Sequence, residues 1–165
     1  MNKKYVTEKP FELLEQAQAD VSVIEDWLKK ENISDNIKYG RSCYHATQAV
    51  EKMLKAYLKE MGDMKVVKIH NLNIILRQIT NKNKSFEILT RDCAYLNEYT
   101  AEMRYSSKNE ITKDEVKEVI KRVNNVYMFK DIFNLYEKYS NSNYFILIIN
   151  KYLNKLLNSE NIFAD

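Results

Sequence analysis

Two histidines, His45 and His70, are the side chains of this sequence best suited to move a proton near neutral pH. They lie far apart in the chain, and neither has the cysteine and histidine neighbours that a zinc site needs. The sequence also contains no glycine-rich phosphate loop and no nucleophile motif. No cofactor or metal is therefore expected, and both histidines must also be considered as binding residues.

The polar residues around His45 recur at helical spacing. In a helical projection, the side opposite the apolar stripe carries Arg41, His45, Gln48, Lys52, Lys55 and Lys59. Ala49 and Ala56 flank this side, and small residues let a second helix approach closely. The polar side is therefore either a solvated face without function or a basic, hydrogen-bonding surface for a phosphate-bearing ligand or a partner helix.

Three residues outside this stretch are further candidates for ligand binding. His70 either orients the start of the next helix or contacts a ligand. Arg104 follows a helix end, where a cation suits the negative end of the helix dipole, and anion binding is the rival role. Tyr105 either packs in the core or stacks on a base. The candidate binding residues are thus Arg41, His45, Gln48, Lys52, His70, Arg104 and Tyr105.

Five amphipathic helices and a less regular sixth must position these residues. The expected ranges are 10–30, 35–61, 71–79, 86–103, 112–139 and 144–157. Pro10 suits a first helical turn, Gly62 suits a helix end, Asn71 is a credible cap, and Thr112 with Glu115 fits the capping-box pattern. The isoleucine-rich start of the sixth segment would also fit a strand. Short connections between long helices favour an up-and-down bundle.

The composition supports an all-α fold of five core helices with a sixth at the C-terminus. The 165 residues suit one domain, and 45% of them are hydrophobic. Only 2 glycines and 1 proline are present, too few for the turns of an all-β chain. We expect a single domain over 1–165, with a core at about 10–139. The extension at 140–165 either closes the bundle or contributes to a dimer contact.

The remaining sequence features predict a folded cytoplasmic protein. Aromatic residues make up 12% of the chain and the net charge is only +3, which disfavours disorder. Cys43 and Cys93 lie in apolar helical patterns, which favours core thiols over a disulfide and suits a reducing compartment. The start of the chain lacks the apolar stretch of a signal peptide. The longest apolar run, 144–149, falls far short of the roughly 20 residues of a membrane span.

Three blocks of the sequence resemble HEPN domains. CYHATQAVEKMLKAYLKEMG at 43–62 resembles the signature helix of that family. KIHNLNIIL at 68–76 resembles its His-Asp-Leu helix start, with Asn71 in place of aspartate. YTAEMRYSS at 99–107 resembles its Tyr-x-x-x-x-Arg-Tyr-Pro element, with Ser106 where proline is common. The resemblance covers about residues 10–139, and 140–165 lies outside it.

The resemblance implies a helical bundle that often forms dimers. It also implies nucleotide binding and a role beside a minimal nucleotidyltransferase in toxin–antitoxin or defence modules. Other branches of the family are metal-independent ribonucleases, which use an Arg-x4-6-His motif across a dimer. That motif is not completed here, because residues 38–40 and 63–65, where its arginine would precede His45 or His70, contain no arginine. Arg104 is likewise followed at 109–111 by residues other than histidine.

The sequence therefore predicts a non-catalytic HEPN-type helical domain that binds a nucleotide or a partner protein. A second copy of the chain and a minimal nucleotidyltransferase are the expected partners, and RNA is a further candidate ligand. Two alternatives stay open. One is a divergent metal-independent ribonuclease that uses Arg104 with His70 or His45. The other is a structural adaptor without a ligand.

Overall fold

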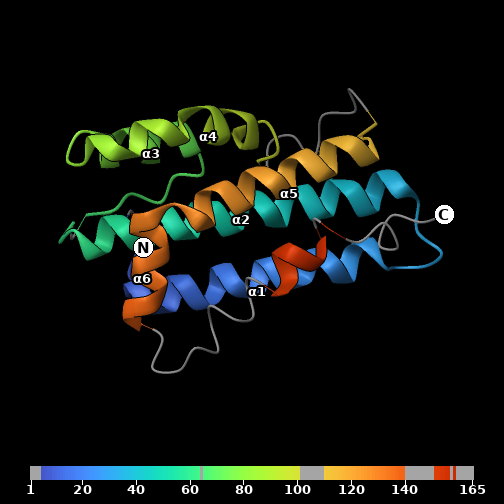
Figure 1. Ribbon diagram of the computed structural model, residues 1–165, viewed down its shortest axis with the longest axis horizontal. Coiled ribbons are helices and arrows are strands. Elements are labelled where there is room, and N and C mark those ends of the chain that lie inside the picture. The colour runs from blue at the N-terminus through green and yellow to red at the C-terminus, as the bar shows by residue number, and fades with distance from the viewer. Residues whose placement is uncertain (1–4, 64, 101–109, 140–150, 157, 159–165) are drawn as a thin grey trace.

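A layered arrangement of helices makes up the computed structural model, which describes residues 5–63, 65–100, 110–139, 151–156 and 158. The elements are α1 (Pro10–Leu28), α2 (Asp35–Glu60), α3 (Leu72–Thr80), the 3-10 helix η1 (Lys84–Leu89), α4 (Thr90–Asn97), α5 (Lys113–Met128) and α6 (Lys130–Tyr139). In Figure 1, α1, α2 and α5 run side by side, α3 and α4 form a layer beyond them, and α6 turns across one end. The all-α prediction is confirmed for these residues.

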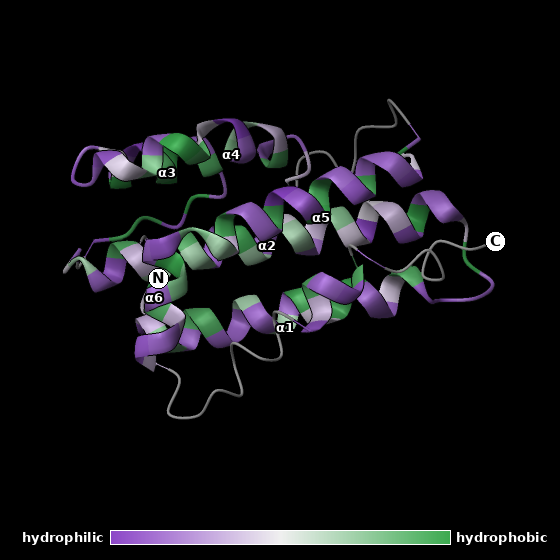
Figure 2. Cartoon of the chain, in the orientation of Figure 1, coloured by the Kyte–Doolittle hydropathy of each residue, from purple (hydrophilic) through white to green (hydrophobic). Residues whose placement is uncertain are grey.

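Helix α2 is the central element of the bundle. It contacts α1, α3, α4, α5 and α6, so almost every side of it is covered. The apolar stripe residues Val50 and Met53 have no exposed surface, and neither do Ala49 and Ala56. The two alanines therefore pack inside this chain, and the expectation that they flank an exposed face is wrong. Figure 2 shows hydrophobic and hydrophilic residues alternating along the helices, as the packing of amphipathic helices requires.

The predicted helix signals act where the sequence places them. Pro10 is the first residue of α1, and Gly62 follows α2 with a left-handed φ of 81°. The backbone N–H of Ile74 donates to the Asn71 side chain at 3.1 Å, which caps α3. The capping box at the start of α5 is complete, since Thr112 and Glu115 bond each other's backbone N–H groups.

The predicted fourth helix differs from the observed one at both ends. The chain enters it earlier, through the 3-10 turns of η1, and α4 begins only at Thr90. Helix α4 ends at Asn97, whereas the prediction extended it to Met103. Residues 101–109, with the connection predicted there, lie outside the described part of the chain.

The predicted fifth helix is two helices, separated at Phe129. Phe129 takes an extended conformation with φ −62° and ψ 127°, so α5 ends before it and α6 begins after it. Its ring centroid lies 4.6 Å from that of Phe86, which in turn lies 4.4 Å from that of Tyr57. Because aromatic side chains bury large apolar areas, the contact of Phe129 with Phe86, which itself packs on Tyr57 of α2, offsets the loss of helix continuity.

A carboxylate fixes the start of α6 after this break. Asp131 accepts hydrogen bonds from Asn83 at 2.8 Å, Ser85 at 3.3 Å and Tyr57 at 3.4 Å. These donors come from the α3–η1 connection, η1 and α2. Burial raises the pKa of the Tyr57 hydroxyl, so this phenol stays protonated and can keep donating. The break at Phe129 is therefore held by polar and aromatic contacts together.

The C-terminal segment is helical over residues 151–156. Leu153 and Leu156 are each 1% exposed and belong to the same core as α1 and α2. The prediction of a sixth helix is confirmed for this part, whereas the strand alternative concerned only the isoleucine-rich start of the segment. The isoleucine-rich stretch 144–149 lies outside the described residues. Within the described parts of the chain, no helix has the length and apolar character to cross a bilayer.

Both cysteine thiols are fully buried, and we expect them to be unreactive in the folded protein. Burial raises the pKa of Cys93 to about 12, with a smaller contribution from Asp92, and burial raises that of Cys43 as well. The thiolate is the reactive form, so little of it exists at pH 8. Ellman's reagent should titrate both thiols in urea and neither in buffer. Rapid reaction of the native protein would contradict this burial.

Candidate functional site

A continuous strip of polar side chains runs along α2, between α1 and the segment that leads into α3. We refer to it as the polar seam. Its members are Asp20 from α1, then His45, Gln48, Glu51, Lys52 and Lys55 from α2, and His70 from the segment before α3. The α2 members recur at three- and four-residue steps, which places them along one side of the helix. The structure thus gathers four of the predicted binding residues: His45, Gln48, Lys52 and His70.

At one end of the polar seam, the carboxylate of Asp20 joins α1 to α2. Its Oδ1 lies 2.9 Å from Nδ1 of His45, and its Oδ2 forms an ion pair with Nζ of Lys52. All three side chains are at least three-quarters buried, since their exposed fractions are 13%, 24% and 22%. Both oxygens of the carboxylate are therefore engaged from the neighbouring helix.

At the other end, the carboxylate of Glu51 collects three donors. Its Oε1 lies 2.6 Å from Nζ of Lys55, and its two oxygens lie 3.2 and 3.1 Å from Nδ1 of His70. Nε2 of Gln48 donates to it at 3.4 Å. Glu51 and Lys55 are four residues apart on α2, a spacing that is common for surface ion pairs. The side chains are instead only 5% and 6% exposed, so this is a buried ion pair.

The two imidazole rings are oriented in the same way. In each ring Nδ1 faces a carboxylate, so the neutral tautomer that satisfies the hydrogen bond carries its proton on Nδ1. Among the described residues, no hydrogen bond engages Nε2 of either ring. His70 is 63% exposed and His45 only 24%. Nε2 of His70 is thus the polar-seam atom best placed to accept a hydrogen bond or a proton from outside.

The charges of the polar seam cancel when both histidines are neutral. Two lysines, Lys52 and Lys55, face two carboxylates, Asp20 and Glu51. One of the two interpretations of this side in the sequence was a basic surface, and it did not include the acids that the fold brings in, Asp20 and Glu51. Lys52 and Lys55 therefore neutralise the protein's own carboxylates, and they are not free cations.

Arg41 is not part of the polar seam. It is exposed, and its guanidinium lies 5.7 Å from the centroid of the Trp27 ring near the end of α1. Nζ of Lys30 lies 4.0 Å from the same ring. These are cation–π distances, so the first turns of α2 are attached to α1 through an aromatic contact.

Arg104 and Tyr105 lie within 101–109, outside the described residues, and their distance from the polar seam is therefore not described. Tyr99, which lies before this stretch, packs against the core. Its hydroxyl lies 3.5 Å from that of Tyr95 and 3.4 Å from Glu115. Burial raises the pKa of Tyr99, with smaller contributions from Tyr95 and Glu115.

Two residues of the polar seam were missed as site residues in the sequence. Asp20 lies between Ala17 and Val21 of the apolar stripe of α1 and pairs with residues 25 and 32 positions away, which only the packing of α1 on α2 can specify. Glu51 was not among the residues predicted to bind a ligand. A usable signal was its place between the apolar pairs Ala49–Val50 and Met53–Leu54, because a carboxylate near buried residues requires donors nearby.

The cap that begins α3 also fixes the backbone next to His70, and we expect its loss to destabilise the protein. Replacing Asn71 with alanine removes the acceptor for the Ile74 N–H and should cost about 1 kcal/mol. Asn71→Asp should retain the stability, since aspartate caps equally well. The free energy of unfolding from urea denaturation measures both. Asn73→Ala, at an exposed position of the same helix, is the control and should have little effect.

The described residues define an all-α bundle whose central helix carries a buried, charge-balanced row of histidine, lysine and carboxylate side chains. Residues 11–133 match the family model of the HEPN domain. The chain therefore belongs to the HEPN domain family, as the sequence predicted. No curated protein and no solved structure matches the chain.

Proposed function

We propose that this chain is a non-catalytic HEPN module that binds a partner through the exposed edge of the polar seam. The observation that supports this proposal most directly is the orientation of His70. Its Nδ1 is held by Glu51, the side chain is 63% exposed, and none of the hydrogen bonds between described residues engages its Nε2. A ring fixed in this way loses little rotational freedom on binding, which favours recognition.

The charges of the polar seam favour a protein partner over a free nucleotide. A triphosphate needs cations or several unpaired donors, whereas Lys52 and Lys55 are already neutralised by Asp20 and Glu51. A protein surface needs hydrogen-bonding groups and few unpaired charges, because buried unpaired charges weaken an interface. The polar seam meets this requirement. A nucleotide is the second candidate ligand in this proposal. Arg104, which lies outside the described residues, would then contact its phosphates.

The nature of the partner is proposed from the family. We infer a minimal nucleotidyltransferase as the partner, a second copy of this chain as a dimer mate, and a role in a toxin–antitoxin or defence-like system in the cytoplasm. This setting suits a module whose own histidines lie next to carboxylates.

Binding measurements on the whole chain test the proposal. The reading frame next to the gene is cloned, and its product is titrated into the chain by calorimetry, in parallel with ATP and GTP. A complex with a nucleotidyltransferase that is weakened about tenfold or more by His70→Ala would support the protein-partner form. Asn73→Ala serves as the matched control on the same exposed side of α3. Light scattering gives the oligomeric state.

The outcomes separate the parts of the proposal. Heat with a nucleotide but not with the protein would replace the protein partner by the nucleotide. A strict monomer would remove the dimer alone. A chain that binds neither the neighbouring protein nor a nucleotide would overturn the binding function and leave the structural adaptor.

The polar seam also supports one enzymatic alternative, a divergent metal-independent ribonuclease. A histidine whose Nδ1 is held by a carboxylate has Nε2 available as a general base, and His70 with Glu51 has this geometry. In this alternative Arg104 would stabilise the charge on the phosphate. Cleavage of RNA by the pure protein in EDTA, lost in both His70→Gln and Arg104→Ala, would establish it. Intact RNA after prolonged incubation would exclude it.

A further inference from the structure

The backbone around His70 is fixed on both sides. Before it, the N–H of Ile69 donates to the carbonyl oxygen two residues earlier at 2.9 Å. After it, the N–H of Leu72 donates to Oδ1 of Asn97 at 2.8 Å, which attaches the start of α3 to the end of α4. Nδ1 of the ring lies next to the carboxylate of Glu51. The main chain and the side chain of His70 are therefore both held in place.

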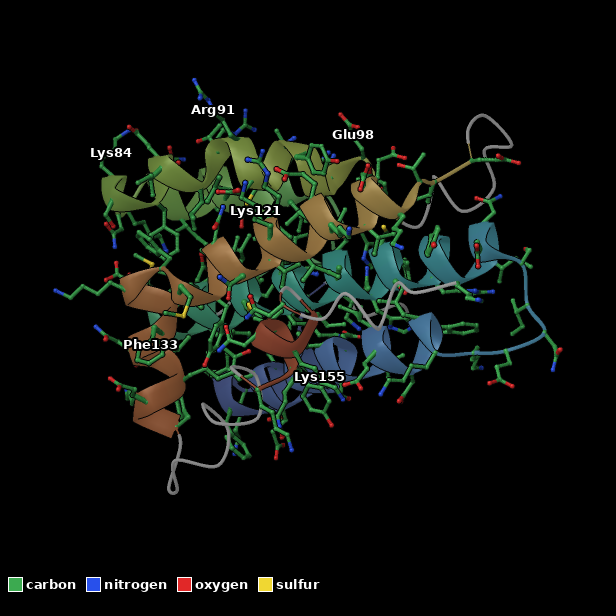
Figure 3. All side chains as sticks on the ribbon, turned by 45° about the vertical axis from the view of Figure 1, so that its right-hand side comes forward. Lys84, Arg91, Glu98, Lys121, Phe133 and Lys155 are labelled. Atoms are coloured by element: carbon green, nitrogen blue, oxygen red, sulfur yellow. The ribbon has the colours of Figure 1, made fainter. Side chains whose placement is uncertain are left out.

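Two exposed charged side chains of α4 show the contrast. Arg91 and Glu98 extend away from the ribbon in Figure 3, and no ion pair or side-chain hydrogen bond with another described residue holds either head group. Ordering such a long side chain costs free energy when a partner binds. His70 avoids most of this cost because its ring is already oriented.

The carboxylate of Glu51 also places the proton on the His70 ring. A carboxylate only accepts hydrogen bonds, so a neutral ring beside it carries its proton on Nδ1. The other nitrogen, Nε2, then has a lone pair and is an acceptor. The ammonium group of Lys55, whose Nζ lies 2.6 Å from Oε1 of Glu51, already balances the charge of this carboxylate. Nothing at this end of the polar seam therefore requires a positive charge on the ring.

We propose that His70 selects its partner by accepting a hydrogen bond at Nε2, so that the group bound there is an N–H or O–H donor of a partner protein. This inference rests on the proposed function, because it names the chemistry of the partner at the same exposed edge. An ionised phosphate or carboxylate oxygen carries only lone pairs and is repelled by Nε2 of the neutral ring. An amide, hydroxyl or ammonium group fits directly.

Nitrogen NMR of the imidazole rings in the full-length chain tests the position of the proton without any partner. An ordinary imidazole is neutral at pH 8. At this pH the spectrum should show a protonated Nδ1 and an unprotonated Nε2 for His70, whose signals are identified by their loss in His70→Gln. In urea, where Glu51 no longer faces the ring, the signals should report a mixture of both neutral forms. A native ring with its proton on Nε2, or with the same mixture as in urea, would overturn the proposal.

Two substitutions of His70 test the donor on the partner. The protein encoded by the neighbouring reading frame is titrated at pH 8 into the wild type, His70→Gln and His70→Lys. The glutamine amide oxygen replaces the acceptor, so the affinity of His70→Gln should stay within about threefold, whereas the lysine ammonium only donates and should weaken binding at least about tenfold. Asn73→Lys adds the same charge at an exposed position three residues along the chain and should bind like the wild type. Circular dichroism confirms that each variant is folded.

The outcomes distinguish this inference from the proposed function. Equal binding by His70→Lys and the wild type, or an equal loss of affinity in Asn73→Lys, would overturn the donor and leave the partner protein in place. A wild type that binds no protein would overturn the proposed function and the donor with it, even if NMR places the proton on Nδ1.

Discussion

Replacing Met53 with aspartate should unfold the protein. Met53 lies in the middle of α2, has no exposed surface and belongs to the core that joins all the layers of the bundle. The substitution removes a buried side chain and places a charge where no donor is available. Each of these effects costs several kcal/mol, whereas domains are stable by only about 5–15 kcal/mol. The expected result is loss of the folded state, not a selective loss of binding. Val50→Asp, one turn earlier, should act in the same way.

Circular dichroism and thermal denaturation measure this prediction. The matched control is Met128→Asp, the same change at a methionine that is 52% exposed at the end of α5. That variant should fold and unfold cooperatively, with at most a small loss from placing a negative charge at a helix C-terminus. If Met53→Asp melts cooperatively near the melting temperature of the control, Met53 does not lie in the core and α2 is not the central helix of the bundle.

Removing the carboxylate of Glu51 should produce the second largest effect. Its partner Lys55 is only 6% exposed, and Glu51→Ala leaves that ammonium group without a counter-charge in the interior. Breaking a buried ion pair by removing one partner costs about 3–5 kcal/mol, because the remaining charge is not solvated. The free energy of unfolding from urea denaturation should fall by this amount. The same variant also frees the His70 ring from its acceptor.

A double variant separates the ion pair from general packing. Glu51→Leu with Lys55→Met removes both charges and should recover most of the stability that Glu51→Ala loses, since apolar replacements of buried pairs are often neutral. Glu87→Ala is the surface control, because its pair with Lys84 is largely exposed and such pairs contribute little. If Glu51→Ala is as mild as Glu87→Ala, the Lys55 ammonium reaches water and the polar seam is not buried.

Local sequence signals predicted most of the fold. Pro10, Gly62, Asn71 and the Thr112 capping box act within a few residues of their position, so helix starts and ends could be derived from the chain itself. The break between α5 and α6 at Phe129 could not be derived from the sequence in this way. The apolar spacing continues from α5 into α6, and the break depends on contacts with distant residues, of Phe129 with Phe86 and of Asp131 with Asn83. Sequence periodicity contains no information about such a partner.

The sequence predicted several residues of the candidate site but not the balance of its charges. The helical projection identified His45, Gln48 and Lys52 on one side of α2, and the structure keeps them together. The projection of one helix could not show that Asp20 neutralises this side, because the contact of Asp20 joins residues on different helices. Burial of Glu51 was also hidden, since a helix covered on nearly all sides has no single solvent face.

The packing of α1 along α2 also has a kinetic consequence. These two helices share the most extensive contact in the bundle, and only residues 29–34 separate them, so their contacts are local in sequence. Local contacts require little loop closure, and chains rich in them cross the folding barrier quickly. We expect the α1–α2 hairpin to form the nucleus. Substitutions at Ala17 or Val21 should therefore slow folding, whereas those at Leu156 should mainly accelerate unfolding.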